Sequence, residues 1–328
     1  MSHTDLWRPT TTHTALVWRA ESLARLRRFF AERGVLEVDT PLLSSAATTD
    51  PQLESFQTRL VGPGVPEGRT LYLNTSPEFA MKRLLAAGSG PIYQVCKAFR
   101  QGEIGRLHNP EFTLLEWYRP GFDHFQLMDE VAELVTVLAA DHLCLDTPER
   151  LDYGQLFRDR LGIDPHGATL TELQDCAVRH LSVNASQDWE RDEWLDLLMS
   201  HIIQPQLGKG RLSFVYHYPA SQAALARVRP GEPALAERFE LFLAGVELAN
   251  GFHELGDSDL QRARFEADME SRHRRGLAAI AMDERLLAAL AQGLPDCAGV
   301  ALGLDRLLLA LASGENLAEV LSFPIGRS

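Results

Sequence analysis

Two apolar segments joined by a polar loop are the feature that most constrains this fold. The stretch "IYQVCKAFRQGEIGRLHNPEFTLLEWY", residues 92–118, has strand-like composition at both ends. Side chains alternate along a strand, which puts Cys96, Ala98 and Arg100 on one face and Leu114, Glu116 and Tyr118 on one face. We therefore predict a long antiparallel hairpin whose loop carries Arg100, Glu103, Arg106, His108, Asn109 and Glu111. That loop set favours an anionic, planar ligand.

The charged residues at the ends of these two faces allow two interpretations. Arg100 and Glu116 could form an internal ion pair, or Arg100, Glu116 and Tyr118 could line a pocket. The residues by themselves favour neither interpretation.

Bulk composition narrows the class of protein. With 328 residues and 45% hydrophobic composition, the chain can bury a sizeable core. A formal net charge of −13 argues against broad, nonspecific binding to nucleic acid. The first fourteen residues lack an apolar signal core and the apolar runs are too short to cross a bilayer, so we predict a cytoplasmic protein without membrane contact.

Cysteine and histidine spacing gives no sign of a metal centre. Cys96, Cys144, Cys176 and Cys297 are scattered and form no CxxC pair, so we predict buried, reduced thiols. The eleven histidines show no HExxH or other metal spacing. We therefore expect His201 and His217 to be structural or surface residues, and we predict no transition-metal site.

The first third of the chain predicts a helix, short strands and a second helix. Residues 15–33 place Leu16, Ala20, Leu23, Leu26 and Phe30 on one helical face, with Gly34 as the stop. A strand, "VLEVDTP", follows and ends at Pro41, and residues 44–70 read as an irregular excursion. After "LYL", Ser76 is a predicted N-cap, Pro77 the first helical residue, and Gly88 lies beyond the helix end. Glu78 in the first turn either complements the helix dipole or receives an amino group.

The remaining two thirds predict a helical region followed by strands. Residues 126–212 read as mostly helical. The strands "LSFVYHYP" and "RFELFLAGVELANGFHEL" follow, and the second turns at Ala244 and Gly245. Glu240, Glu247 and Glu254 recur every seven residues. Because Glu240 and Glu247 lie in segments fit for burial, we expect them to face a cation, either a metal ion or an amine.

The last motif, "GVALGLDRLLLAL", is a glycine-bearing strand that runs into an apolar helix. Arg306 in the first turn can reach a phosphate or an aromatic ring, and glycine lets a flat ligand approach the backbone. Each feature also has a plain structural reading, because glycine can relieve packing and Arg306 can cover the helix end.

The order of these elements resembles the class II aminoacyl-tRNA synthetases. Within that class, "HNPEFTLLEWY", "ELANGFHEL" and "GLDRL" look like the lysyl-tRNA synthetase subgroup. The first core helix begins near residue 15, which leaves no room for the anticodon-reading OB domain. The whole chain is thus similar to the bacterial elongation factor P (R)-β-lysine ligases. The resemblance implies an α+β fold with an antiparallel sheet flanked by helices, as one domain over residues 1–328 with a helical insertion at about 124–212.

The same resemblance implies the activity and its partners. That family activates (R)-β-lysine with ATP as an adenylate and transfers it to a lysine of elongation factor P. Class II synthetases are typically dimers through their first helix and strand, so residues 15–43 imply a homodimer. No stable tRNA binding is expected.

Roles for individual residues follow from the family motifs. Arg100 and Arg306 are implied as catalytic groups on the phosphates, and Glu240 and Glu247 as ligands of Mg²⁺. The implied lysine pocket comprises Ser76, Pro77, Glu78, Glu116, Tyr118, Asn250, Glu254 and Ala301. The implied ATP contacts are Arg100, Gln101, Gly102, Glu103, His108, Asn109, Glu247, Leu248, Gly303 and Arg306.

Two positions depart from the class pattern. Gly102 stands where the class has a glutamate that contacts adenine, so either Glu103 takes that role or the backbone of Gln101 and Gly102 does. Ala301 stands where the synthetases usually have glycine, and we expect its methyl group to help favour β-lysine over α-lysine.

Two other functions fit the same motifs. One is a lysyl-tRNA synthetase-like enzyme without an anticodon domain, and the other is a catalytically silent, lysine-binding regulatory relative. A silent relative need not retain Arg100, Glu240, Glu247 and Arg306 together, which argues against it.

Overall fold

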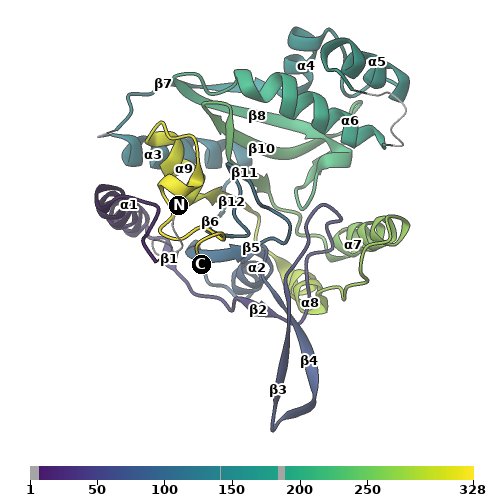
Figure 1. Cartoon of the computed structure of the whole chain (residues 1–328). Helices are drawn as coiled ribbons and strands as arrows, with labels where there is room; N and C mark the ends of the chain where they lie inside the picture. Colours follow the sequence, from purple (N-terminus) through teal and green to yellow (C-terminus); the bar gives the residue numbers. More distant parts are fainter. Residues whose placement is uncertain (1–6, 141, 184–188) are drawn as a thin grey trace. The chain divides into compact units, whose positions relative to one another are not determined.

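The computed structural model describes residues 7–140, 142–183 and 189–328 (Figure 1). Two compact units divide the chain. The first holds the described residues up to Gly121 with Gly256–Cys297 and Ala301–Ser328, and the second holds Phe122–Leu255 and Ala298–Val300. Residues 141 and 184–188 of the predicted insertion lie outside the described residues. The single-domain prediction and the insertion boundaries stay predictions.

The predicted hairpin is confirmed in the first unit. Strands β5 (Ile92–Phe99) and β6 (Glu111–Pro120) pair antiparallel, with Gln94 opposite Glu116. A two-residue strand, β1 (Leu36–Glu37), pairs parallel with β5. The predicted strand at residues 35–41 is therefore much shorter than expected.

Helix α1 (His13–Glu32) confirms the first predicted helix but not its whole buried face. Thr12 caps its start, and Gly34 follows its end with a φ of +64° that favours glycine. Leu26 and Phe30 are buried as predicted, and Phe30 stacks on Tyr93 with ring centroids 4.3 Å apart. Leu16 and Ala20 are exposed instead, so that part of the predicted face is wrong.

The predicted irregular excursion at residues 44–70 is confirmed for residues 45–56 and wrong for most of the rest, which forms strands. A separate three-stranded sheet, in the order β2 (Leu43–Ser44), β4 (Val65–Leu73), β3 (Gln57–Gly62), occupies this region. The hairpin of β3 and β4 extends away from the rest of its unit (Figure 1). Most of its side chains are exposed, so the sequence lacks the apolar alternation that signals a strand.

Three helices complete the helical layer of the first unit. Helix α2 (Glu78–Ala86) packs against α8 (Glu284–Gly293), which also contacts α7 (Ser258–Arg274). The N-cap of α2 is Pro77 rather than Ser76, so the predicted start is one residue early. The sequence analysis did not predict α7 and α8. A core formed by Met81, Leu85, Ile92, Tyr118 and Cys297 joins α2 to β5 and β6.

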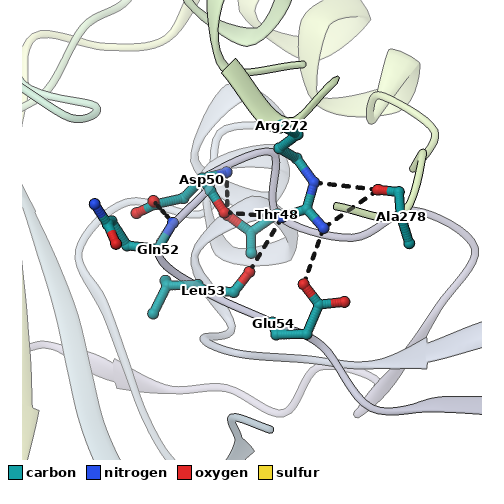
Figure 2. A network of polar contacts seen from close by, with 7 residues as sticks. All are labelled: Thr48, Asp50, Gln52, Leu53, Glu54, Arg272 and Ala278. Carbon is teal, nitrogen blue, oxygen red and sulfur yellow. Dashed lines mark hydrogen bonds and ion pairs between the residues drawn. The ribbon is translucent and has the colours of Figure 1, made fainter. Parts of the chain in front are cut away.

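A buried arginine ties α7 to the segment before β3 (Figure 2). Arg272 donates to the backbone oxygens of Asp50 and Leu53 and pairs with the Glu54 carboxylate at 2.9 Å. Its guanidinium also donates to the Ala278 carbonyl oxygen. Because the Gln101 N–H donates to the Glu54 carbonyl at 2.8 Å, this arginine network also supports the start of the β5–β6 loop.

The second unit is built on mainly antiparallel strands. Its strand order is β11 (Val246–His253), β10 (Leu235–Leu243), β8 (Arg211–Pro219), β7 (Asp146–Asp152), and β9 (Val228–Arg229) pairs with β10. The β7–β8 pair is parallel. Strand β7 lies within the region predicted as mostly helical. Helices and mainly antiparallel strands thus occur in both units, which confirms the α+β class.

Helices cover the strands of the second unit. They are α3 (His124–Ala139), α4 (Tyr153–Leu161), α5 (Leu170–His180) and α6 (Arg191–Leu198), and short helical turns span Met199–Ile203, Gln204–Gln206 and Ala220–Gln222. The helical character predicted for 126–212 is confirmed for the described part. Tyr153, Phe157, Trp194 and Phe242 are among the side chains of the core between these helices and the sheet.

Strand β12 (Cys297–Gly303) runs directly into α9 (Leu304–Leu311), as predicted, and a last turn spans Leu317–Glu319. Cys176 and Cys297 are buried, but Cys144 is exposed, so the prediction of buried thiols fails there. All four cysteines lie among the described residues, and none of them forms a disulfide. Within the part of the chain that the structure describes, no helix has the length and apolar character needed to span a membrane.

The β10–β11 hairpin has small residues at its turn and at a tightly packed position of β11. Ala244 and Gly245 both have positive φ, at 51° and 75°, and form the predicted tight turn. Gly251 lies opposite Phe239, and a Cβ atom at Gly251 would come within 2.4 Å of the Phe239 ring. Because Phe239 is fully buried, its ring has nowhere to move.

Gly251→Ala is therefore expected to lower stability by about 1–3 kcal/mol, the usual cost of overpacking a core. The measurement is the urea midpoint of the purified chain by circular dichroism. Gly62→Ala is the matched control, since a Cβ there meets nothing within 4 Å. Equal midpoints for the two variants would contradict this packing.

Candidate functional site

A buried carboxylate on β6 is the centre of a polar network in the first unit. Glu116 is 2% exposed. Its Oε2 accepts a hydrogen bond from the Ser76 hydroxyl at 2.7 Å, and its Oε1 accepts one from the Tyr118 hydroxyl at 2.7 Å. Hydrogen bonds to the charged form compensate in part for the loss of water. The structure therefore brings together three residues that the sequence analysis assigned to one pocket.

Glu78 belongs to the same group of residues. Its backbone N–H donates to Ser76 Oγ at 3.0 Å, and its carboxylate pairs with Lys82 at 2.7 Å. Lys82 is 2% exposed. The amino group that contacts Glu78 in this structure is thus the side chain of Lys82, one turn further along α2. Sequence reasoning missed Lys82. The i, i+4 spacing of Glu78 and Lys82 on a predicted helix could have found it.

The charge of Glu116 has an effect on a neighbouring thiol. Burial, together with the nearby carboxylates of Glu116 and Asp39, raises the pKa of Cys96 to about 12. Cys96 therefore stays a neutral thiol at physiological pH and adds no negative charge beside Glu116.

The arginine at the end of β5 retains donor capacity. The Arg100 guanidinium lies 5.1 Å from the centroid of the Phe112 ring, and its Nη1 is 3.5 Å from the Glu103 carboxylate. Among the described residues, its buried Nε has no hydrogen-bond partner. Glu116 instead bonds Ser76 and Tyr118, so these contacts favour the pocket interpretation of Arg100, Glu116 and Tyr118.

The β5–β6 loop gathers basic side chains around His108. Burial lowers the pKa of His108, and the positive charge of Arg306 lowers it further, with a smaller opposing effect from Glu103. Arg306 donates from Nε to the Leu107 carbonyl at 3.1 Å, which attaches α9 to the loop. His108 is therefore neutral at physiological pH, and the cationic groups here are Arg100 and Arg306.

The other loop residues have structural contacts. Asn109 donates to the Glu111 carbonyl at 2.5 Å and accepts from the Ile325 N–H at 2.9 Å. Gly102 has a φ of +85°, a conformation that favours glycine. The Gln101 N–H already donates to the Glu54 carbonyl oxygen. It is therefore not available to bind adenine, which was one of the alternatives for that contact. The adenine role of Glu103 stays a prediction.

A buried aspartate fixes the start of α9. Asp305 accepts from the Arg19 guanidinium at 2.6 Å and from the Thr113 N–H at 2.7 Å. These bonds link α1, β6 and α9, and they set the position of the adjacent Arg306. Ala301 and Gly303, at the end of β12, are partly exposed.

The second unit contains its own buried acidic cluster. Glu240 accepts from the Tyr218 hydroxyl at 2.6 Å and pairs with Arg238. Arg238 also donates to the Asn250 side-chain oxygen at 3.2 Å. The cation that the sequence analysis expected near Glu240 is thus, in part, an arginine two residues earlier on the same face of β10.

Burial and neighbouring charges shift the pKa values of carboxylates in this acidic cluster. Burial raises the pKa of Glu240, Arg238 opposes that effect, and the charge of Glu247 adds to it. Burial likewise raises the pKa of Asp196 to about 6. Leu248 is buried, and Glu254 is 2% exposed. Sequence reasoning missed Arg238, Tyr218 and Asp196, and of these only Arg238 had a signal, its two-residue spacing from Glu240.

Comparisons with known proteins identify the family of this chain. The family model described as tRNA synthetases class II (D, K and N) matches residues 1–327. The chain belongs to that family. Proteins named elongation factor P–(R)-beta-lysine ligase from Yersinia enterocolitica and Edwardsiella ictaluri are each 51% identical to it, and one from Salmonella paratyphi B is 49% identical. Each match covers all of both chains.

Membership of this family confirms the resemblance stated from the motifs, including the class II synthetase fold. Family membership does not assign roles to individual site residues, and those assignments stay predictions.

Proposed function

We propose that this chain uses ATP to activate (R)-β-lysine and joins it to a lysine side chain of elongation factor P. The observation that carries the proposal is the 49–51% identity, over full length, to proteins that bear this ligase name. The class II synthetase family adds support for activation by ATP. The buried carboxylates described above suit a substrate that carries ammonium groups.

The chemistry has two steps. The carboxylate of the amino acid attacks the α-phosphate of ATP, which forms the aminoacyl adenylate and releases pyrophosphate. The acceptor lysine amine, in its neutral form, then attacks the carbonyl carbon, which forms the amide, releases AMP and gives up one proton. Positioning and charge stabilisation are the main contributions that a protein can make to the first step.

In the first unit we assign the phosphates to the arginines. Arg100 and Arg306 offer planar, permanently charged donor groups that match phosphate oxygens. Arg100 has a buried Nε without a partner in the described part of the chain, which supports a ligand contact there. The neutral His108 between these arginines avoids adding a third like charge. Gly303, Asn109, Gln101, Gly102 and Glu103 remain proposed nucleotide contacts.

We assign the ammonium of the substrate to the polar network of Ser76, Glu116 and Tyr118. Each oxygen of Glu116 accepts one hydroxyl, and a carboxylate oxygen has a second lone pair for a further donor. Glu116 is buried, whereas the side chain of Glu78 is 17% exposed, so Glu116 is the stronger candidate for binding an ammonium group. Pro77, Ala301, Asn250 and Glu254 remain proposed pocket residues.

In the second unit, Glu240 and Glu247 fit a magnesium ion. Oxygen ligands are what Mg²⁺ prefers, and it is commonly held by one or two carboxylates. The charge of Glu247 raises the pKa of Glu240, so a shared divalent cation would relieve that repulsion. When bound, the ion would neutralise phosphate charge. Leu248 lies between Glu247 and Ala249, where the register of the hairpin shifts, and it remains a proposed ATP contact.

We also propose a cytoplasmic homodimer formed through residues 15–43. In the single chain, Val17 is 43% exposed, Leu36 is 58% exposed and Leu43 is 45% exposed. These apolar side chains lie on the segment that pairs subunits in class II synthetases by resemblance. The expected result of sedimentation velocity is a dimer that Leu36→Glu shifts toward monomer, whereas Leu60→Glu, on the exposed β3 strand, does not. A wild-type monomer at micromolar concentration would contradict the proposal.

The proposed function is tested by the intact mass of elongation factor P after incubation with this chain, Mg·ATP and (R)-β-lysine. One added lysyl group is expected, faster with (R)-β-lysine than with α-lysine, and none without ATP. No adduct with either amino acid would contradict the transfer. Charging of tRNA in a parallel reaction would then favour a synthetase, and no pyrophosphate release would favour a silent relative.

The assignment of Glu116 is tested by Glu116→Gln. Loss of a charged hydrogen-bond acceptor costs about 1.5–3 kcal/mol, which is roughly a ten- to hundredfold rise in KM for the amino acid. The KM for ATP should change little, because the amide is nearly isosteric. Glu149→Gln is the matched control, since Glu149 also accepts a serine hydroxyl, that of Ser213. An unchanged amino-acid KM in Glu116→Gln would refute the assignment.

A further inference from the structure

Two histidines and a glutamate meet in the second unit, away from the residues assigned above. His124 is the first residue of α3, Glu237 lies in β10, and His253 is the last residue of β11. Each offers one ligand atom, and these atoms all lie within 4.8 Å of one another. Glu237 and His253 are joined by a 2.7 Å contact between Oε2 and Nδ1. This group is called the histidine cluster below.

His124 is the unusual member of the histidine cluster. It is 4% exposed, and among the described residues neither ring nitrogen has a hydrogen-bond partner. A buried polar group left without a partner costs about 1–3 kcal/mol. A neutral imidazole ring has a lone pair to offer to a metal ion. A bound cation would satisfy that lone pair.

A third histidine lies beside the histidine cluster. The rings of His217 and His124 have centroids 6.2 Å apart. His217 bonds through Nδ1 to the Asp152 carboxylate at 2.9 Å, and its buried Nε2 has no partner in the described part of the chain. A carboxylate on one ring nitrogen is the usual orienting contact of a metal-binding histidine. The backbone of His217 has a φ of +62°, which is energetically costly for a residue with a side chain. Strained backbone conformations of this kind are concentrated at functional sites.

We propose that His124, Glu237 and His253 bind a divalent transition cation, with His217 placed to complete the coordination. Imidazole nitrogens with one carboxylate suit zinc, whereas Mg²⁺ prefers an all-oxygen shell. The Glu237–His253 hydrogen bond gives way to metal bonds when the ion enters. The sequence analysis predicted no such site, because His124 lies more than 100 positions before Glu237 and His253, and the three residues follow no short metal-binding spacing.

The site is distinct from the proposed magnesium site. Side chains alternate between the two faces of a sheet, so Glu237 and His253 point away from the face that carries Glu240 and Asn250. Helix α3 packs against both β10 and β11. A metal ion would therefore connect the start of α3 to the ends of these two strands, and we expect it to stabilise this part of the second unit.

The test is metal binding by the intact, chelator-treated chain, followed by competition between Zn²⁺ and Co²⁺. One Co²⁺ per chain is expected, with visible absorption that tetrahedral nitrogen and oxygen ligands intensify and that Zn²⁺ abolishes. A Zn²⁺-dependent rise in melting temperature should accompany it, because a ligand that binds only the folded state stabilises that state. Failure of the wild-type chain to bind Zn²⁺ at micromolar concentration would overturn the proposal.

Variants identify the ligands. His124→Gln and Glu237→Gln should each weaken Zn²⁺ binding at least tenfold and abolish the Co²⁺ absorption, while His201→Gln, an exposed histidine of the same unit, should retain both. Melting without added metal shows whether each variant folds. A folded His124→Gln chain that binds Zn²⁺ as tightly as wild type would overturn the assignment. These experiments measure metal binding and not ligase activity, so their outcome does not depend on the proposed function.

Discussion

Carboxylates buried within strands are the constraint on which the rest of this structure depends. Glu116 on β6 and Glu240 on β10 each sit in segments that otherwise bury apolar side chains, and each accepts a tyrosine hydroxyl. An ionised carboxylate in such a place is expensive unless it is hydrogen-bonded or paired. Hydroxyl groups hydrogen-bond both carboxylates, and Arg238 adds a counter-charge to Glu240.

Long-range polar contacts hold these carboxylates and their neighbouring arginines in place. Asp305 links α9 to α1 and β6, which positions Arg306, and Arg272 holds the segment that bonds to the start of the β5–β6 loop. Both are buried charged residues with several partners, and residues on rigid elements give more precise sites than residues on free loops. The loop that carries Arg100 is therefore supported from both sides.

Local signals in the sequence predicted the local parts of this structure. Alternation predicted the β5–β6 hairpin, the Ala244–Gly245 turn predicted the β10–β11 hairpin, and the strand before Arg306 leads into α9 as expected. The β3–β4 hairpin escaped prediction because its side chains are mostly exposed and so lack periodicity. Arg238 and Lys82 are counter-charges of Glu240 and Glu78 on the same face of their own elements. Their only signal in the sequence is a spacing of two residues along a strand and of four along a helix. The histidine cluster joins residues more than 100 positions apart, and no spacing rule covers that distance.

The central claim is that Glu116 and its hydroxyl partners bind the side-chain ammonium of the substrate. The most direct measurement is ATP–pyrophosphate exchange with (R)-β-lysine and, in parallel, with 3-aminohexanoic acid of the matching configuration, which keeps the chain and the 3-amino group but lacks the terminal ammonium. The account predicts exchange with (R)-β-lysine and almost none with 3-aminohexanoic acid, since the charged hydrogen bond from the terminal ammonium to Glu116 is lost. Equal exchange with the two amino acids would contradict it.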